Sequence, residues 1–184
     1  MSYCCHCGSP VTLKIPVGDN VKRYVCESCE AIHYQNPNIV TGTIPTWDNK
    51  VLLCRRAIEP RMGYWTTPAG FMENYETVQE GAARETWEEA RAKVTELKLF
   101  GVFNLPHISQ VYMMFTGIVV DGKCAPGPES IETAWFTESE IPWDKLAFPV
   151  IHEALSLFYE QDNENVYTGD IYRQEDNKVV IKRY

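Results

Sequence analysis

A short acidic segment, residues 70–92, restricts the fold of this chain more than any other part of its sequence. Thr77, followed three residues later by Glu80, is a capping-box pattern and predicts a helix that begins at Thr77. Most of the residues that follow favour or tolerate a helix, whereas Gly81 costs about 1 kcal/mol relative to alanine. A glycine at this position indicates either a close approach of another chain segment or simple tolerance.

Glu85, Glu88 and Glu89 lie three or four residues apart and would share one face of this helix. Their charges repel one another, and the helix dipole disfavours anions late in a helix. Arg84 can pair with Glu88 or with Glu76, but one cation cannot neutralise three carboxylates. Converging carboxylates suit Mg²⁺ or Mn²⁺, hard cations that commonly bridge to phosphate oxygens. The alternative is a solvated acidic helix face.

Four of the seven cysteines form two Cys-x2-Cys pairs, Cys4 with Cys7 and Cys26 with Cys29, with eighteen residues between the pairs. Two such turns present four thiolates to one tetrahedral Zn²⁺, and this closed site is structural because it leaves no position for water. Two disulfides are the alternative, but nothing else in the sequence indicates secretion. Residues 1–33 are therefore predicted to form a zinc ribbon, with short strands at 11–15 and 21–25.

Length and charge exclude several classes of protein. The 184 residues are enough for one ordinary domain and a small appendage. The formal net charge of −8 disfavours a nucleic-acid partner, since proteins that bind the phosphate backbone usually carry a basic excess. No apolar run approaches the roughly 20 residues of a membrane span, and the first residues do not resemble a signal peptide. We therefore expect a cytoplasmic protein with no membrane partner.

Residues 38–163 alternate strand-like and helix-like segments. Two apolar segments, 38–47 and 50–56, flank Asp48-Asn49 and predict a hairpin, and a second helix is predicted from residue 149. The pattern indicates an α/β or α+β fold, a mixed sheet with helices packed on it. The tail, 164–184, carries two strand-like segments around a polar turn, which predicts either a β-hairpin or a contact that forms a homodimer.

The order of residues in the acidic segment resembles the signature of the Nudix hydrolases, G-x5-E-x7-R-E-U-x-E-E-x-G-U, in which U is apolar. The matching positions are Gly70, Glu76, Arg84, Glu85, Glu88 and Glu89. Thr86 stands where an apolar residue is usual, and Arg91 replaces the last glycine. This replacement makes the turn at the end of the helix hard to predict, because a glycine at that position usually adopts the left-handed backbone conformation that ends a helix.

The resemblance implies an α/β/α sandwich that hydrolyses a nucleoside diphosphate linked to another group. It also implies that Glu85, Glu88 and Glu89 hold Mg²⁺ or Mn²⁺. The Gly70 carbonyl would add a ligand, and Glu76 would pair with Arg84 to brace the helix. Clustered divalent ions suit this reaction independently, since they neutralise developing charge and activate water.

The resemblance leaves the general base and the substrate open. The base is Glu85, or else Glu129 or Glu132 of a later loop. Residues 23–45, 65–77, 106–115 and 133–151 resemble zinc-ribbon Nudix hydrolases related to plant FAD and ADP-ribose pyrophosphatases. The further S-Q-P-W-P-F-P-x-S type motif of the NADH pyrophosphatases is missing after the acidic segment.

The implied substrate is a small nucleotide, ADP-ribose or FAD, cut to AMP plus ribose 5-phosphate or FMN. The candidate contacts to its rings and phosphates are Arg56, Tyr64, Phe71 and Gln110. The alternatives are a nucleotide-sensing binding module and an enzyme that acts on RNA caps or oxidised nucleotides.

Overall fold

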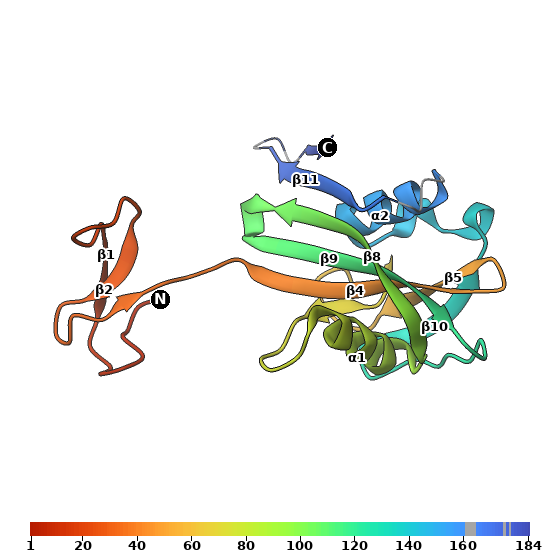
Figure 1. Cartoon of the computed structure of the whole chain (residues 1–184), viewed down its shortest axis with the longest axis horizontal. Coiled ribbons are helices and arrows are strands. Elements are labelled where there is room, and N and C mark those ends of the chain that lie inside the picture. The colour runs from red at the N-terminus through yellow and green to blue at the C-terminus, as the bar shows by residue number, and fades with distance from the viewer. Residues whose placement is uncertain (161–164, 175, 177) are drawn as a thin grey trace. The chain divides into compact units, whose positions relative to one another are not determined.

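The computed structural model describes residues 1–160, 165–174, 176 and 178–184. The chain divides into two compact units, Met1–Pro37 and Asn38–Tyr184 (Figure 1). The boundary predicted between residues 163 and 164 lies outside the described residues. In the described part of the chain, no helix is both long and apolar enough to cross a membrane.

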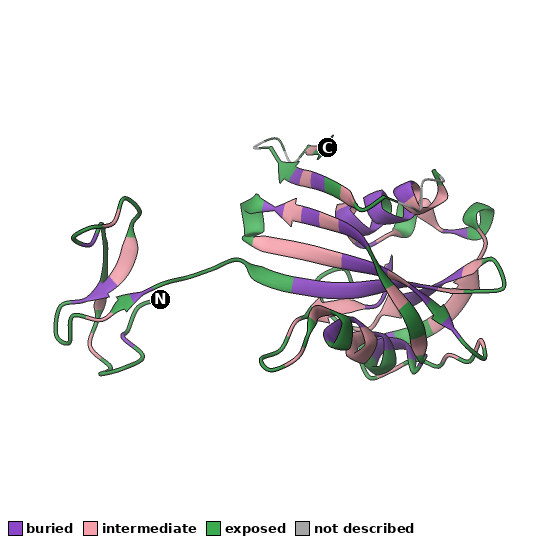
Figure 2. Cartoon of the chain, in the orientation of Figure 1, coloured by how far each residue is buried: buried purple, intermediate pink, exposed green. Residues whose placement is uncertain are grey.

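The first unit is a three-stranded antiparallel sheet, β1 (Val11–Lys14), β2 (Arg23–Cys26) and β3 (Ile32–His33). The first two strands confirm the prediction, while β3 was not predicted. Most side chains of this unit are exposed or only partly buried (Figure 2). A unit with so little apolar core needs another source of stability, such as a bound metal ion.

In the part of the chain that the structure describes, the second unit contains one large sheet, two α-helices and three short 3₁₀ helices. In chain order its elements are β4 (Asn38–Trp47), β5 (Lys50–Arg56), β6 (Trp65–Thr66), β7 (Ala69–Phe71), α1 (Val78–Ala90), β8 (Val94–Leu105), η1 (Pro106–Ile108), β9 (Gln110–Val119), β10 (Ser130–Phe136), η2 (Glu138–Glu140), η3 (Trp143–Lys145), α2 (Pro149–Tyr159), β11 (Tyr167–Arg173) and β12 (Val179–Arg183). The strand order is β10-β5-β4-β9-β8-β11-β12, with β6 paired to β5 and β7 to β4.

The sheet is mixed, as predicted: β4 and β9 are parallel, β11 and β8 are parallel, and the remaining pairs are antiparallel. The hairpin expected at Asp48-Asn49 joins β4 to β5, and both of these residues have positive φ. Short polar residues tolerate that left-handed conformation well, which explains their place in the turn.

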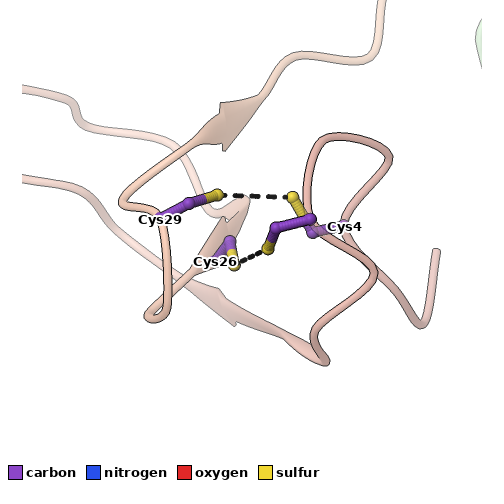
Figure 3. Close-up of side chains that lie close together, drawn as sticks. Cys4, Cys26 and Cys29 are labelled. Carbon is purple, nitrogen blue, oxygen red and sulfur yellow. Dashed lines mark hydrogen bonds between the residues drawn. The ribbon is translucent and has the colours of Figure 1, made fainter.

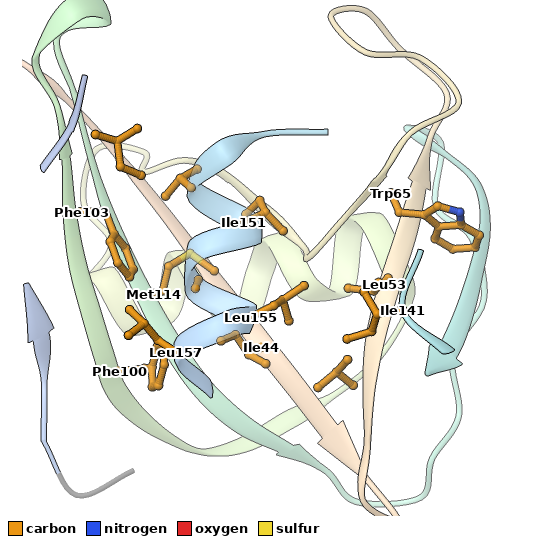
Figure 4. Packing of buried hydrophobic residues seen from close by; sticks show 14 of the residues in the cluster. Ile44, Leu53, Trp65, Phe100, Phe103, Met114, Ile141, Ile151, Leu155 and Leu157 are labelled. Atoms are coloured by element: carbon orange, nitrogen blue, oxygen red, sulfur yellow. The ribbon is translucent and has the colours of Figure 1, made fainter. Parts of the chain in front are cut away.

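The two helices cover opposite faces of the sheet, which confirms the α/β/α sandwich (Figure 1). Alternate residues of β5 pack into different layers, as the two-residue period of a strand requires. Val51 and Leu53 belong to the larger apolar cluster around α2 (Figure 4). Leu52 and Cys54 instead pack with the end of α1.

Helix α1 begins as the sequence predicts. Thr77 is the N-cap, its hydroxyl accepts from the Glu80 amide at 3.2 Å, and the Glu80 carboxylate accepts from the Thr77 amide at 2.8 Å. Gly81 is explained by close approach, because a Cβ there would lie 2.7 Å from Thr41 Cγ2. The helix ends at Arg91, which adopts the left-handed conformation (φ 49°) even though it is not glycine.

Thr86 is polar although it is buried where an apolar residue is usual, and its hydroxyl both donates and accepts a hydrogen bond. Thr86 Oγ1 donates to the Ala82 carbonyl at 2.7 Å, so its short 2.6 Å contact with Thr43 Oγ1 must be donated by Thr43. Both threonines are fully buried. This pair fixes α1 to β4 through a polar bond in an apolar layer.

Replacing Thr86 with the apolar residue usual at this position should therefore destabilise the protein. Thr86→Val removes the acceptor of the buried Thr43 hydroxyl, and we expect a loss of about 1–3 kcal/mol in the free energy of unfolding. The double variant Thr43→Val/Thr86→Val leaves no orphaned hydroxyl and should recover most of that loss. Urea unfolding of the three proteins measures this; a double variant no more stable than Thr86→Val would contradict it.

Candidate active site

Arg84 lies at the centre of the acidic segment and uses all of its donors. Nε and Nη2 bind both carboxylate oxygens of Glu76 at 3.0 and 2.8 Å, and Nη2 also donates to the Phe71 carbonyl at 3.1 Å. Nη1 donates to Glu85 at 2.7 Å and to Glu88 at 3.2 Å. A guanidinium has five N–H groups, so one side chain holds the loop before α1, the end of β7 and two helical carboxylates together.

Strand β7 supplies the backbone against which the helical carboxylates lie. The Ala69 amide donates to Glu89 Oε2 at 3.3 Å. A Cβ on Gly70 would overlap the Glu85 carboxylate, so a larger residue at this position would displace that side chain. Glu89 is 7% exposed and the Glu85 side chain 12% exposed, whereas the Glu88 side chain is 52% exposed. Two of the three carboxylates are thus largely removed from water.

This arrangement moves the pKa values of the glutamates in opposite directions. The Arg84 guanidinium lowers the pKa of Glu76 to about 2. Burial raises the pKa of Glu85 although Arg84 opposes the shift. Burial, together with the charge of Glu85, raises the pKa of Glu89 to about 8. Glu76 is therefore a permanent anion, and Glu89 carries a proton near neutral pH unless a cation offsets its charge.

The donor set fits a hard divalent cation. Glu85, Glu88 and Glu89 offer carboxylate oxygens, the ligands that Mg²⁺ and Mn²⁺ prefer. Their desolvation is a cost that a bound cation would relieve. Among the described residues, however, they do not form a set whose oxygens all lie within 4.8 Å of one another. Glu85 and Glu88 are directed to Arg84 instead, so sharing an ion requires their side chains to rotate.

The two later carboxylates occupy different surroundings. The charge of Glu129 contributes to raising the pKa of both Glu85 and Glu89, and the loop before it lies at the end of α1, where the Gly127 amide donates to the Glu89 carbonyl at 2.9 Å. Its loop is fixed by the hydrogen bond from the Ala57 amide to the Glu129 carbonyl at 2.8 Å. Glu132 lies within β10 and pairs with Arg55 at 3.8 Å.

A cleft of about 540 Å³ begins at β7, next to the acidic cluster. Its charged and aromatic lining residues are Arg56, Arg61, Phe71, His107, Tyr112, Phe148, Tyr172 and Arg173. Among the residues that the structure describes, no carboxylate lines the cleft, although the chain as a whole is acidic. The cleft therefore combines ring surfaces with groups that attract anions.

Three of the four predicted substrate contacts, Arg56, Phe71 and Gln110, line this cleft. In the described part of the chain Tyr64 does not line it, and its ring lies 5.3 Å from the Arg61 guanidinium instead. Sequence reasoning missed Phe148, at the start of α2, and the residues from β11. Phe148 is an aromatic residue directly before Pro149, and nothing in that local sequence indicates whether such a residue lines a cleft or packs in the core.

The four cysteines of the first unit form a compact set. Their sulfur atoms all lie within 4.8 Å of one another (Figure 3). Cys4 and Cys29 are 3.6 Å apart, and Cys7 and Cys26 are 3.5 Å apart. Tetrahedral Zn²⁺ with bonds of about 2.3 Å separates its sulfurs by about 3.8 Å, so this set fits the ion. All seven cysteines are free, so the disulfide alternative is wrong.

Comparison with known proteins identifies both units. The NUDIX domain family matches residues 37–157, and the zinc-ribbon family described as Nudix N-terminal matches residues 2–35. The chain belongs to the Nudix hydrolases. A crystal structure of a NUDIX hydrolase from Nitrosomonas europaea is 52% identical to it, covers 94% of this chain and 99% of that one, and superimposes with a TM-score of 0.89.

Two curated Nudix relatives carry different names. The ADP-ribose pyrophosphatase of Methanocaldococcus jannaschii is 32% identical over 132 residues, which cover 68% of this chain and 75% of that protein. The NAD-capped RNA hydrolase NudC of Deinococcus radiodurans is 33% identical over 149 residues, which cover 76% of this chain and 50% of that protein. The chain thus spans only about half the length of this NudC relative.

The raised pKa of Glu89 predicts that this Nudix unit loses stability as the pH rises, when Mg²⁺ and Mn²⁺ are absent. Between the ordinary value of 4.5 and about 8, native Glu89 holds a proton that the unfolded chain has lost. The free energy of unfolding therefore falls across this window. Glu89→Gln has no proton to lose and should flatten the fall. Urea unfolding at several pH values measures it; equal slopes for the two proteins would contradict the assignment.

Proposed function

We propose that this Nudix hydrolase cuts the pyrophosphate bond of ADP-ribose or FAD, releasing AMP plus ribose 5-phosphate or FMN. The observation that carries the proposal is the position of Glu85 and Glu89 on α1, which lie against Ala69-Gly70 where a cationic and aromatic cleft begins. A substrate with a pyrophosphate at its centre and rings at its ends matches both parts of this site.

Glu85, Glu88 and Glu89 would hold Mg²⁺ or Mn²⁺, which when bound neutralises charge on the phosphates and makes a water molecule nucleophilic. Arg84 holds Glu85 and Glu88 at 2.7 and 3.2 Å, and both carboxylates would rotate from it to share an ion, while its pairing with Glu76 keeps Arg84 beside them. The charge of Arg84 therefore organises the carboxylates and is not available to the substrate.

Arg56 is the residue best suited to contact the phosphates. Its charge lowers the pKa of Glu89, so it lies in the electrostatic field of the acidic cluster as well as in the cleft. Nε donates to the Pro60 carbonyl at 2.9 Å, and the guanidinium lies 5.1 Å from the Phe148 ring. These contacts fix its plane and leave Nη1 and Nη2 for phosphate oxygens, which a guanidinium can bind in pairs.

The relatives support a pyrophosphatase and leave two substrate classes. The ADP-ribose pyrophosphatase shares most of its length with this chain, which favours a small nucleotide. The NudC relatives favour a second candidate, an RNA that carries an NAD cap. The acidic balance of the chain weighs against a long contact with RNA phosphates.

Product analysis tests the proposal. ADP-ribose, FAD, NADH and NAD-capped RNA are each incubated with the protein and Mg²⁺ or Mn²⁺, and products are separated by chromatography. We expect release of AMP from ADP-ribose or FAD, and a fall of at least about 10²-fold in kcat for Glu88→Gln, in line with the loss of a transition-state electrostatic contact. Glu80→Gln is the matched control, because glutamine preserves the capping box on the same helix.

Cleavage of capped RNA alone would replace the proposal by the second candidate. If none of the four substrates is cleaved, the proposed activity is wrong. If the activity of Glu88→Gln stays within a few fold of the wild type, Glu88 is not a ligand of the catalytic metal.

The two later glutamates should differ in their effect on catalysis. Glu129 lies near Glu85 and Glu89, whereas Glu132 is paired with Arg55. If Glu129 is the general base, Glu129→Gln lowers kcat by about 10²–10⁴-fold, while Glu132→Gln leaves it nearly unchanged. Steady-state kinetics on the cleaved substrate measure both variants. Equal, small effects would assign proton transfer to Glu85.

A further inference from the structure

His33 ends β3 of the zinc ribbon and is 8% exposed, unlike most side chains of that unit. The antiparallel pairing of β3 with β2 sets it opposite Tyr24. A polar side chain that is removed from water needs hydrogen-bond partners. Both ring nitrogens of His33 face a cysteine: Nε2 lies 3.3 Å from Cys4 Sγ, and Nδ1 lies 3.7 Å from Cys5 Sγ.

The imidazole lies beside the four zinc-binding cysteines without belonging to their set. Among the residues that the structure describes, the set whose ligand atoms all lie within 4.8 Å of one another contains these cysteines alone. Four thiolates complete the tetrahedral coordination of Zn²⁺ and leave no position for a further ligand. His33 is therefore placed to act on Cys4, a ligand of the ion, and not on the ion itself.

The two sulfur contacts determine which nitrogen of His33 carries the proton. A zinc-bound cysteine is a thiolate with no proton to donate, so the hydrogen between Nε2 and Cys4 must belong to Nε2. Cys5 lies outside the set of ligands and has an S–H group, which can donate to an unprotonated Nδ1. The contact with Cys5 thus favours the tautomer that the contact with Cys4 requires.

Cys4 is a ligand for which such a donor matters. It is 3% exposed, whereas two of the other three ligands are exposed to water. Four thiolates carry two negative charges more than one Zn²⁺ neutralises, and a buried charge is stabilised by hydrogen bonds that replace those to water. The His6 backbone amide lies 3.4 Å from Cys4 Sγ and supplies one such bond. The His33 ring is positioned to supply the second.

We propose that His33 is a positioning residue of the zinc site, whose Nε2–H donates to the Cys4 thiolate and strengthens the binding of the ion. The inference rests on the Zn²⁺ that the four cysteines fit, and it is independent of the substrate proposed above. Groups that hydrogen-bond to metal ligands fix their orientation, and losing such a group typically costs about 10–100-fold in metal affinity. The strand β3 is thereby coupled to the ion although it supplies no ligand.

Competition between the full-length protein and a chromogenic chelator for zinc tests the proposal. Leucine at position 33 fills space but has no donor, so His33→Leu should bind zinc about 10–100-fold more weakly than the wild type. The side-chain amide of glutamine can donate from the place of Nε2–H. His33→Gln should therefore recover most of the lost affinity.

The second histidine of the ribbon provides a matched control. The His6 ring packs edge-on against the His33 ring, with the ring centroids 5.5 Å apart. His6→Ala removes this ring contact but keeps the backbone amide that donates to Cys4. It should therefore bind zinc nearly as tightly as the wild type. An equal loss of affinity in His6→Ala and His33→Leu would show that ring packing, and not a hydrogen bond, supports the site.

Two spectroscopic measurements separate positioning from the other roles that His33 could have. The ligand-to-metal charge-transfer bands of the Co²⁺-substituted protein report its thiolate ligands, and they should be the same in the wild type and in His33→Leu. Nitrogen NMR of the zinc-loaded wild type should show His33 protonated at Nε2 and unprotonated at Nδ1. This second measurement needs no variant, so it decides the matter even if His33→Leu does not fold.

Several results would overturn the proposal. Zinc affinity that is equal in His33→Leu and the wild type would do so, as would His33→Gln binding zinc no better than His33→Leu. A Co²⁺ spectrum that changes in His33→Leu would make His33 a ligand of the ion. Protonation of His33 at Nδ1 alone would exclude the hydrogen bond to Cys4.

Discussion

The ion pair between Arg84 and Glu76 is the interaction on which the rest of the catalytic unit depends. Three glutamates in the second half of α1 repel one another and oppose the helix dipole. Arg84 offsets part of this cost by binding Glu85 and Glu88. It can do so only because Glu76, in the loop before the helix, fixes its orientation through two hydrogen bonds. The same guanidinium reaches the Phe71 carbonyl and so joins the helix to β7.

The features that could be predicted from the sequence are those determined by residues close together in the chain. The capping box at Thr77, the turn at Asp48-Asn49 and the spacing of the four cysteines each specify a structure within a few residues, and all three are present. The turn at the end of α1 was harder to judge. Arg91 adopts the left-handed conformation there, while the Ala125 and Gly127 amides donate to the Ala90 and Glu89 carbonyls. Those bonds come from a loop that is distant in the sequence, so no local pattern reveals them.

The cleft was less predictable than the acidic cluster, for a physical reason. The carboxylates lie on one helix, where a period of 3.6 residues determines which side chains meet. The lining instead comes from strands β4, β5, β7, β8 and β9, from η1 and α2, and from the C-terminal hairpin of β11 and β12, which the sheet topology brings together. Tyr64, before the acidic segment, and Phe71, at its start, are both aromatic, yet of these two only Phe71 lines the cleft. Composition does not distinguish such positions.

The hydrogen bonds between the 125–127 loop and the end of α1 have a mechanical consequence. They join two backbone segments, not two side chains, and they bring the loop that carries Glu129 so close to the helix that a Cβ on Gly127 would overlap the Glu88 carbonyl oxygen. Among the described residues, the C-terminal hairpin is joined to β8 and to α2, with no comparable backbone hydrogen bond to α1. A substitution in the hairpin can therefore reshape the wall of the cleft without moving the loop that carries Glu129 relative to α1.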